Sequence, residues 1–132
     1  MKTEELISQG FKPAPAEYFT GKVFLKVLVA ADAVTNCNIS DVAFDAGARN
    51  NWHTHPSNQI LMIKEGTCYY QEEGKPIQKF VAGAVINILP GIKHWHGASH
   101  NESMVHVAIN INTEKGMVNW LEPVTDQQYN EK

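Results

Sequence analysis

The chain has 132 residues, of which 43% are hydrophobic and 19% charged, as is typical of one soluble domain with a single core. A formal net charge of −3 and a single arginine, Arg49, give little attraction to nucleic acid, anionic membranes or phosphate groups. No apolar run approaches the roughly 20 residues that cross a bilayer. We therefore expect neither nucleic acid nor a membrane as a partner.

The amino-terminal segment MKTEELISQG is polar and acidic, which does not fit a secretion signal. Residues 1–20 are expected to form an N-terminal arm, and its first twelve residues are either a short helix or a loose segment. Cys37 and Cys68 lie far apart without a CxxC spacing, so we expect free thiols in a reducing compartment. These features favour a cytoplasmic protein.

The middle of the chain consists of short segments rich in Val, Ile, Phe and Tyr, separated by Gly, Asn or Pro. EEGKP (72–76) and IKEG (63–66) have the residues of tight turns. Strands at such short intervals, without helices between them, indicate an all-β sandwich or barrel in one domain. The spacing of Thr125 and Gln128 is that of a capping box, which predicts a short C-terminal helix. The predicted strands are 22–29, 38–44, 59–66, 67–74, 84–91 and 104–111.

The distribution of apolar and polar residues over the two faces of two predicted strands indicates whether the chain forms oligomers. In 104–111 one face is wholly apolar and the other carries His106 and Asn110, so the simplest interpretation places His106 toward solvent. Residues 59–63, however, are apolar on both faces, as in sheets buried on both sides. A small barrel cannot bury the outside of its own wall. The outer apolar face therefore predicts a homodimer or homotetramer, and it leaves an inward orientation of His106 open.

The stretch NNWHTHPSNQ (50–59) places His53 and His55 on the same side of an extended chain, with Gln59 close behind. His94 and His96 repeat the spacing later in the chain. Imidazoles and an amide oxygen from separate strands are able to surround one divalent first-row metal. The alternative is that these are ordinary surface or core histidines, and that the paired spacing arose by chance.

A glycine frame surrounds these histidines. GARNNWHTHPSNQILMIKEG (47–66) and GAVINILPGIKHWHG (83–97) resemble the two signature motifs of the cupin superfamily. The resemblance implies an all-β, double-stranded β-helix (jelly-roll) barrel in a single domain, 1–132, with short terminal helix and a barrel core at 37–111 that holds both motifs. There are two departures. Gln59 stands where most cupins have a glutamate, and PG replaces PxG before His94.

YFTGKV, WHTHPSNQ, KHWHGA, HVAI and WLEPVTDQQY resemble the small cupins labelled carboxymuconolactone-decarboxylase-like, and also the manganese-dependent cupin hydroxynitrile lyases. This implies one divalent metal per chain, with manganese as the first choice and iron, nickel or zinc admissible. It also places His106 beside the metal. A neutral amide ligand would leave the metal its full charge and make it a stronger Lewis acid. The implied ligands are His53, His55, Gln59 and His94.

A substrate pocket follows from strand parity together with the resemblance. Asp41 favours an outward odd face for 38–44, and Asn110 shares the face of His106. His96 is expected to support the ligands rather than bind metal. His100 is expected in solvent, and Trp52 and Trp95 outside the barrel, at a subunit interface. The predicted pocket residues are Ser40, Val42, Phe44, His96 and Asn110.

The leading functional hypothesis is a metal-dependent enzyme for a small substrate that coordinates through oxygen. Its most concrete form is a cyanohydrin-cleaving lyase in which His106 is the general base. His106 as a supporting or packing residue remains the alternative to that role. Two other functions stay open, a dioxygenase that uses iron, nickel or copper, and a non-catalytic cupin that binds a metal or small ligand.

Overall fold

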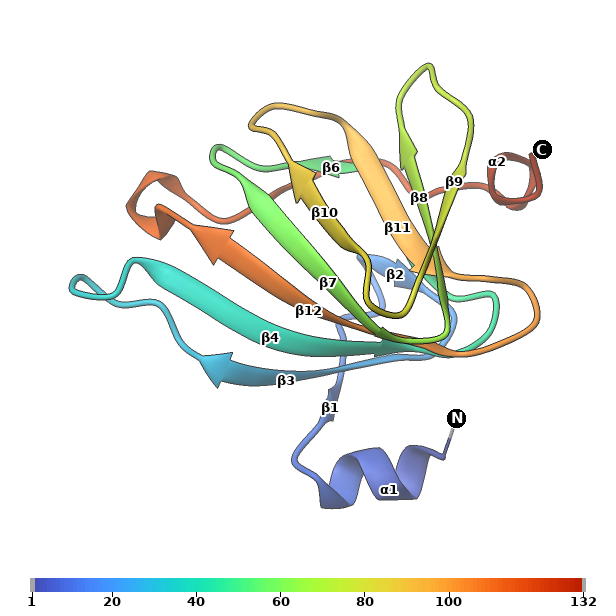
Figure 1. The fold of residues 1–132 in the computed structure, drawn as a ribbon, viewed down its shortest axis with the longest axis horizontal. Coiled ribbons are helices and arrows are strands. Elements are labelled where there is room, and N and C mark those ends of the chain that lie inside the picture. The colour runs from blue at the N-terminus through green and yellow to red at the C-terminus, as the bar shows by residue number, and fades with distance from the viewer. Residues whose placement is uncertain (1, 132) are drawn as a thin grey trace.

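Two antiparallel sheets face each other in the computed structural model, which describes residues 2–131 (Figure 1). Sheet 1 has the strand order β1 (Lys12–Pro13), β3 (Val23–Val29), β4 (Cys37–Phe44), β12 (Met104–Ile111), β7 (Gln59–Glu65) and β10 (Val85–Ile88). Sheet 2 has the order β13 (Asn119–Trp120), β6 (His53–Thr54), β11 (His94–Ala98), β5 (Arg49–Asn50) and β2 (Phe19–Thr20), and β8 (Thr67–Glu72) joins β11 to β9 (Gln78–Val81).

Helices lie only near the ends of the described chain: α1 (Thr3–Ser8), the 3₁₀ turn η1 (Thr113–Lys115) and α2 (Asp126–Tyr129). Within residues 2–131, neither α-helix has the length and apolar character needed to cross a membrane. The predicted capping box is present, because the Thr125 hydroxyl accepts a hydrogen bond from the Gln128 backbone N–H and the Gln128 side chain accepts one from the Thr125 N–H. The all-β barrel with short terminal helix is thus confirmed.

Strand positions agree closely with the sequence. β12 occupies the whole of 104–111, and the other predicted strands lie within a residue or a few of their expected ends. β9, β11 and the two-residue strands β1, β2, β5, β6 and β13 were not among the predicted strands. The turn between β7 and β8 needs Gly66, whose φ is 74° and whose missing Cβ would collide with the carbonyl oxygen of Ser103. Strands of both sheets also lie outside 37–111, notably β3 and β13.

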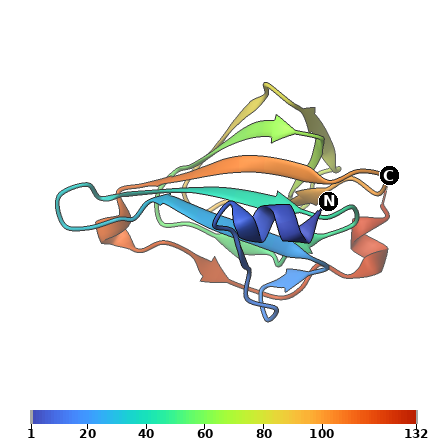
Figure 2. The same cartoon turned by 90° about the horizontal axis from the view of Figure 1, so that it is seen from below.

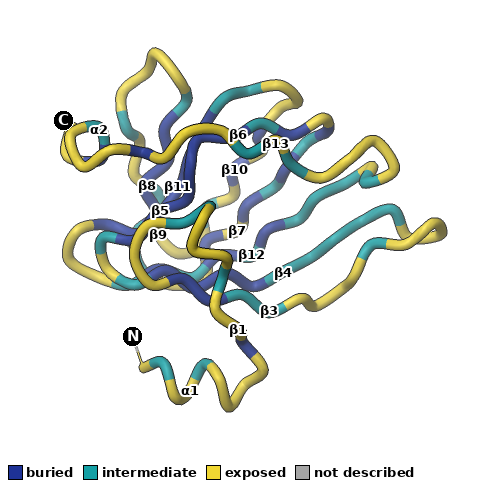
Figure 3. The backbone as a smooth tube through the Cα atoms, turned by 180° about the vertical axis from the view of Figure 1, so that it is seen from behind, coloured by how far each residue is buried: buried dark blue, intermediate teal, exposed yellow. Residues whose placement is uncertain are grey.

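The buried residues, dark blue in Figure 3, lie mainly on the strands of the two sheets, and many of them form one hydrophobic core. Along β12 positions 104, 106 and 108 are buried and the other positions are half-buried, so His106, which has no exposed surface, points inward. The inward orientation is therefore the one observed. Cys68 lies in the same core as a free thiol, and burial raises its pKa to about 12. Further core residues are Phe44, Leu61, Ile63, Ile88 and Met104.

The outer surface of sheet 1 is only partly covered. Helix α1 lies across it (Figure 2), where Leu6 packs near Phe24 and Val105. The remaining apolar residues have no cover from the described chain, and Met62 is 44% and Val85 57% exposed. We call this set the outer apolar face: Ile39, Ile60, Met62, Val85, Val107 and Ile109.

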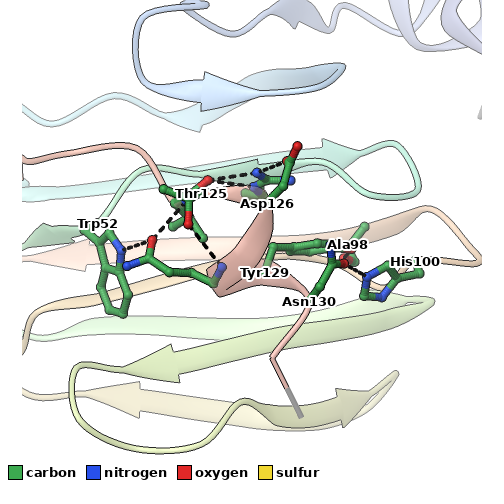
Figure 4. A network of polar contacts seen from close by, with 10 residues as sticks. Trp52, Ala98, His100, Thr125, Asp126, Tyr129 and Asn130 are labelled. Carbon is green, nitrogen blue, oxygen red and sulfur yellow. Dashed lines mark hydrogen bonds and ion pairs between the residues drawn. The ribbon is translucent and has the colours of Figure 1, made fainter.

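The outer surface of sheet 2 is covered by the end of the chain. Trp52 and Trp95 pack there against Val124 and Tyr129, so they lie outside the barrel as expected. Their assignment to a subunit interface is wrong, because the C-terminal segment of the same chain covers both rings. Figure 4 shows how this segment is tied down: the Tyr129 hydroxyl donates to the carbonyl of Ala98 at 2.6 Å, and the Trp52 indole donates to Gln128 at 3.3 Å.

Candidate metal centre

A cavity of about 210 Å³ lies between the two sheets. Four polar side chains face it from sheet 1: Ser40 on β4, Gln59 on β7, and His106 and Asn110 on β12. His53 and His55 face it from β6 and the turn that follows. The five residues that the sequence analysis assigned to the pocket all line this cavity: Ser40, Val42, Phe44, His96 and Asn110.

Three imidazoles converge at the wall that β6 and β11 share. His53 and His94 are paired in register, and their ring centroids are 4.2 Å apart. The His55 ring lies 5.0 Å from that of His53 and 5.4 Å from that of His94. All three rings are buried. The HxH spacing of the first motif and the single histidine of the second are therefore brought together by strand pairing.

Each of the three rings has its Nδ1 hydrogen-bonded to a backbone carbonyl: His53 to Asn51 at 2.8 Å, His94 to Ile92 at 2.8 Å, and His55 to Met117 at 2.6 Å. A carbonyl oxygen only accepts, so the proton is on Nδ1 and each Nε2 keeps a lone pair. Carbonyl acceptors of this kind orient metal-binding histidines in proteins.

Several buried acceptor atoms near the three histidines have no hydrogen-bond partner. They include Nε2 of His55, Nε2 of His94 and Oε1 of Gln59, all buried. Burial lowers the pKa of His55, and the nearby Gln59 side chain opposes this lowering only in part. Burying an acceptor without a partner destabilises the folded protein by roughly 1–3 kcal/mol. Several such acceptors in one place are best explained by a cation that binds them. Neutral nitrogen and oxygen donors suit a divalent first-row metal, and the residues fit such an ion.

A different trio is also close enough to share an ion. One nitrogen from each of His53, His94 and His96 lies within 4.8 Å of the others. His96, however, already has protein partners, because its Nδ1 is 3.1 Å from Nε2 of His106 and both ring nitrogens are near the Asn50 amide. The unpartnered atoms therefore favour His55 over His96 as the third imidazole.

Burial keeps these histidines neutral. It lowers the pKa of His53 and of His96 well below the ordinary value, and neighbouring histidines lower both further. Burial also lowers the pKa of His55, and it lowers those of His94 and His106 to about 4. Among the described residues that line the cavity, none is acidic. Near neutral pH the rings thus present lone pairs to a site without a carboxylate.

Two polar atoms face the cavity beyond the histidine cluster. Nδ1 of His106 and Oδ1 of Asn110 are both buried without a hydrogen-bond partner. His106 is held on its other side by His96 and by Phe44, whose ring centroid is 5.3 Å away. His100, in contrast, is exposed and hydrogen-bonds Tyr69 and Asn130, far from this cavity. One imidazole therefore offers a free nitrogen to any molecule in the cavity.

Several lining residues were not predicted from the sequence. Phe19 on β2 and Trp120 on β13 form an aromatic wall, and the Trp120 ring lies 4.8 Å from that of His53. Both residues lie outside the two cupin motifs. The only indication in the sequence that they belong to the cavity was their place in the segments YFTGKV and WLEPVTDQQY. Ala108 follows from the parity of β12. The remaining unpredicted lining residues are Leu25, Asn50, Met117 and Val118.

Comparison with known proteins agrees with this geometry. Residues 40–110 match the Cupin domain family. The chain is 38% identical over 129 residues to an (R)-mandelonitrile lyase of Granulicella tundricola, covering 98% of each chain. It superposes on a cupin-like protein of Thermotoga maritima with a TM-score of 0.87 at 41% identity, covering 89% of each chain. A cupin-2 domain protein of Rhodospirillum rubrum shares the fold, with a TM-score of 0.68 at 15% identity over 89% of this chain and 75% of that one. The chain therefore belongs to the cupin family.

Proposed function

We propose that this protein is a metal-dependent lyase that cleaves a small cyanohydrin into an aldehyde and hydrogen cyanide. The observation that carries the proposal is the group of unpartnered buried atoms on His55, Gln59 and His94. His55 and Gln59 line the cavity, and so does His106, which has a ring nitrogen without a partner. The full-length similarity to a protein named (R)-mandelonitrile lyase supports this reaction over others that cupins carry out.

The proposed ligands are His53, His55, Gln59 and His94, and the proposed ion is manganese. When bound, such an ion supplies a Lewis acid that stabilises negative charge on a substrate oxygen. The amide of Gln59 contributes no charge of its own to this site. The carbonyls of Asn51, Ile92 and Met117 hold the imidazoles in the tautomer that binding requires.

His106 is the proposed catalytic residue. Its Nδ1 accepts the proton of the substrate hydroxyl, the bond between the carbinol carbon and the nitrile carbon breaks, and the carbonyl double bond forms. The same nitrogen then returns the proton to the departing cyanide, so the ring ends neutral and hydrogen cyanide leaves. Burial lowers the pKa of His106 to about 4, so the ring is neutral near neutral pH and has a lone pair for the hydroxyl proton. The same shift makes the ring a weaker base in the first step and a stronger acid in the second, in which the proton returns to cyanide.

The cavity walls fit a substrate with a compact apolar or aromatic group. Phe19, Phe44 and Trp120 supply ring surfaces, and Leu25 and Val42 supply aliphatic ones. These walls bind the side chain of the substrate and exclude water from the proton that His106 holds. The absence of acidic side chains among the described lining residues disfavours cationic substrates.

The test is metal analysis and mandelonitrile cleavage on the same sample, purified without added metal. We expect about one divalent ion per chain and release of benzaldehyde, which absorbs in the ultraviolet. Removing the metal with a chelator is expected to abolish turnover, and adding manganese to restore it. Metal-loaded protein that released neither benzaldehyde from mandelonitrile nor aldehyde from aliphatic cyanohydrins would overturn the proposal.

A further inference from the structure

A row of amide side chains crosses the inner face of sheet 1. Asn110 on β12 is paired in register with Asn38 on β4 and with Gln59 on β7. Residues paired in this way point to the same face, with their Cβ atoms about 5 Å apart. The Asn38 amide oxygen is engaged, because it accepts a hydrogen bond from the Ser40 hydroxyl at 3.1 Å. Oδ1 of Asn110 and Oε1 of Gln59 are both buried and have no partner.

A glutamine ligand raises a problem of orientation that a glutamate does not. The two oxygens of a carboxylate are equivalent, so either one is able to bind a metal. A primary amide binds through its oxygen only, and turning it over would direct N–H groups at the ion. The Gln59 amide therefore needs a neighbour that accepts from its Nε2 and so selects one orientation.

The strand pairing identifies that neighbour. Gln59 has two cross-strand partners, Asn110 on β12 and Ile88 on β10. Ile88 has no polar atom in its side chain, whereas Asn110 has an unpartnered acceptor. We propose that Asn110 is a positioning residue of the metal centre: its Oδ1, which has no partner in the structure, would accept a hydrogen bond from Nε2 of Gln59 once the ion is bound and so direct Oε1 of Gln59 to the ion. This role rests on the metal site of the proposed function, but not on the reaction.

The experiment measures manganese affinity by competition with a chelator, without any substrate, so the identity of the reaction does not affect it. Asn110→Leu keeps the branched shape and removes the acceptor, and we expect manganese affinity to fall about 10- to 100-fold, as is usual when a residue that orients a ligand is lost. Asn110→Asp keeps an acceptor and is expected to retain the affinity. Asn38→Leu and Asn38→Asp make the same changes one strand further from Gln59, and they report the effects of packing, of charge and of losing an amide whose partner is Ser40.

Combining Asn110→Leu with Gln59→Glu distinguishes an effect on the orientation of the amide from an effect on packing. In Gln59→Glu the two ligand oxygens are equivalent. We therefore expect Asn110→Leu to reduce manganese affinity much less in that variant than beside Gln59. An equal loss in both backgrounds would overturn the proposal, and so would an unchanged affinity of Asn110→Leu beside an intact Gln59. A parent protein that bound no manganese, iron, nickel or zinc would overturn both this role and the metal site. A parent that bound metal and showed the expected pattern would support the role of Asn110 even if it cleaved no cyanohydrin.

Discussion

The side chains of Asn51, Ile92 and Met117 have little in common, yet the carbonyl oxygens of these residues set the chemistry of the site. Each one accepts the Nδ1 proton of a buried histidine and so leaves Nε2 free. The rings are oriented before an ion arrives, which lowers the cost of binding it. Backbone acceptors have no sequence signature, so the motifs lead to the proposed ligands but not to the carbonyls that orient them.

Loss of an imidazole ligand should be severe. His94→Ala removes one of few donors and leaves a space opposite His53, so we expect metal content to fall to a small fraction of one ion per chain. Metal analysis after dialysis checks this. His100→Ala is the matched control, because His100 is exposed and lies outside the cavity. Full metal content in His94→Ala would show that the ligand assignment is wrong.

Loss of His106 should separate catalysis from metal binding. We expect His106→Ala to keep its metal while turnover of mandelonitrile falls roughly a hundredfold or more, the usual size of a general-base contribution. His106→Asn is a second variant, which fills more of the space beside Phe44 if the alanine variant is unstable. If turnover per metal-loaded site were unchanged in both, His106 would be a packing residue, the alternative that the sequence left open.

The strands differ in how well local sequence predicted them, and the reason is physical. β12 alternates between a buried face and a half-buried apolar face, so its full length follows from the pattern. β11 reads HWHGA, and every one of its residues is buried although few are aliphatic. Its Trp95 is covered by Tyr129, whose ring centroid is 5.8 Å away and which is far along the chain. Because the two residues are far apart in the sequence, the residues near Trp95 could not predict that the C-terminal segment covers the outward tryptophans.

The attachment of α2 depends on the single arginine. Arg49 lies beneath Tyr129, with its guanidinium 4.7 Å from the ring, and donates to the Val124 carbonyl through Nε at 3.2 Å and Nη2 at 2.8 Å. Arg49→Lys loses the paired donors and the stacked plane, so we expect unfolding free energy to fall by about 1–3 kcal/mol. Urea unfolding followed by tryptophan fluorescence measures it.

Lys75→Ala is the control for that measurement, because it breaks an exposed ion pair with Glu72 and should change stability by less than about 0.5 kcal/mol. Equal stability of Arg49→Lys and the parent protein would contradict the importance of this attachment.

The outer apolar face bears on how barrels associate. Leu6 of α1 packs near Phe24 and Val105 beside this face, and an ion pair between Lys64 and Asp41 at 3.2 Å lies next to Val107. We propose that a second copy of the chain covers it, giving at least a dimer. Light scattering at micromolar concentration should then exceed the monomer mass of 14.7 kDa.

Met62→Lys together with Val107→Asp places charges within that face and should return the mass toward that of the monomer. Val34→Lys, at a position that is 91% exposed on the loop after β3, should not. A parent protein that was monomeric at this concentration would exclude the interface.

The buried histidines make the barrel sensitive to acid. In the metal-free protein the pKa values of His53, His55, His94, His96 and His106 all lie below the ordinary 6.5 because of burial. Below that pH the unfolded chain binds protons that the folded chain does not, so stability is full above about pH 6.5 and falls as pH drops toward 4. Each such histidine contributes up to about 1.4 kcal/mol per pH unit.

Melting temperatures between pH 8 and 4 check this prediction. The decline should begin near pH 6.5, and added manganese should raise the melting temperature most above that pH, where the ligands are unprotonated. A melting temperature that stayed flat down to pH 4 would contradict the burial of neutral rings.

The hydrogen bond from His55 to Met117 spans 62 positions of the chain, and Trp120 pairs with His53 across β13 and β6. During synthesis on the ribosome, every proposed ligand therefore emerges well before the segment that orients His55 and closes the cavity. Contacts between such distant parts of a chain form late, since the intervening loop must close first. A partly synthesised chain contains the histidines, but they are not yet held together in one site. We therefore expect it to bind metal ions only weakly. The proposed ion is accordingly expected to be acquired by a finished barrel and not to nucleate its folding.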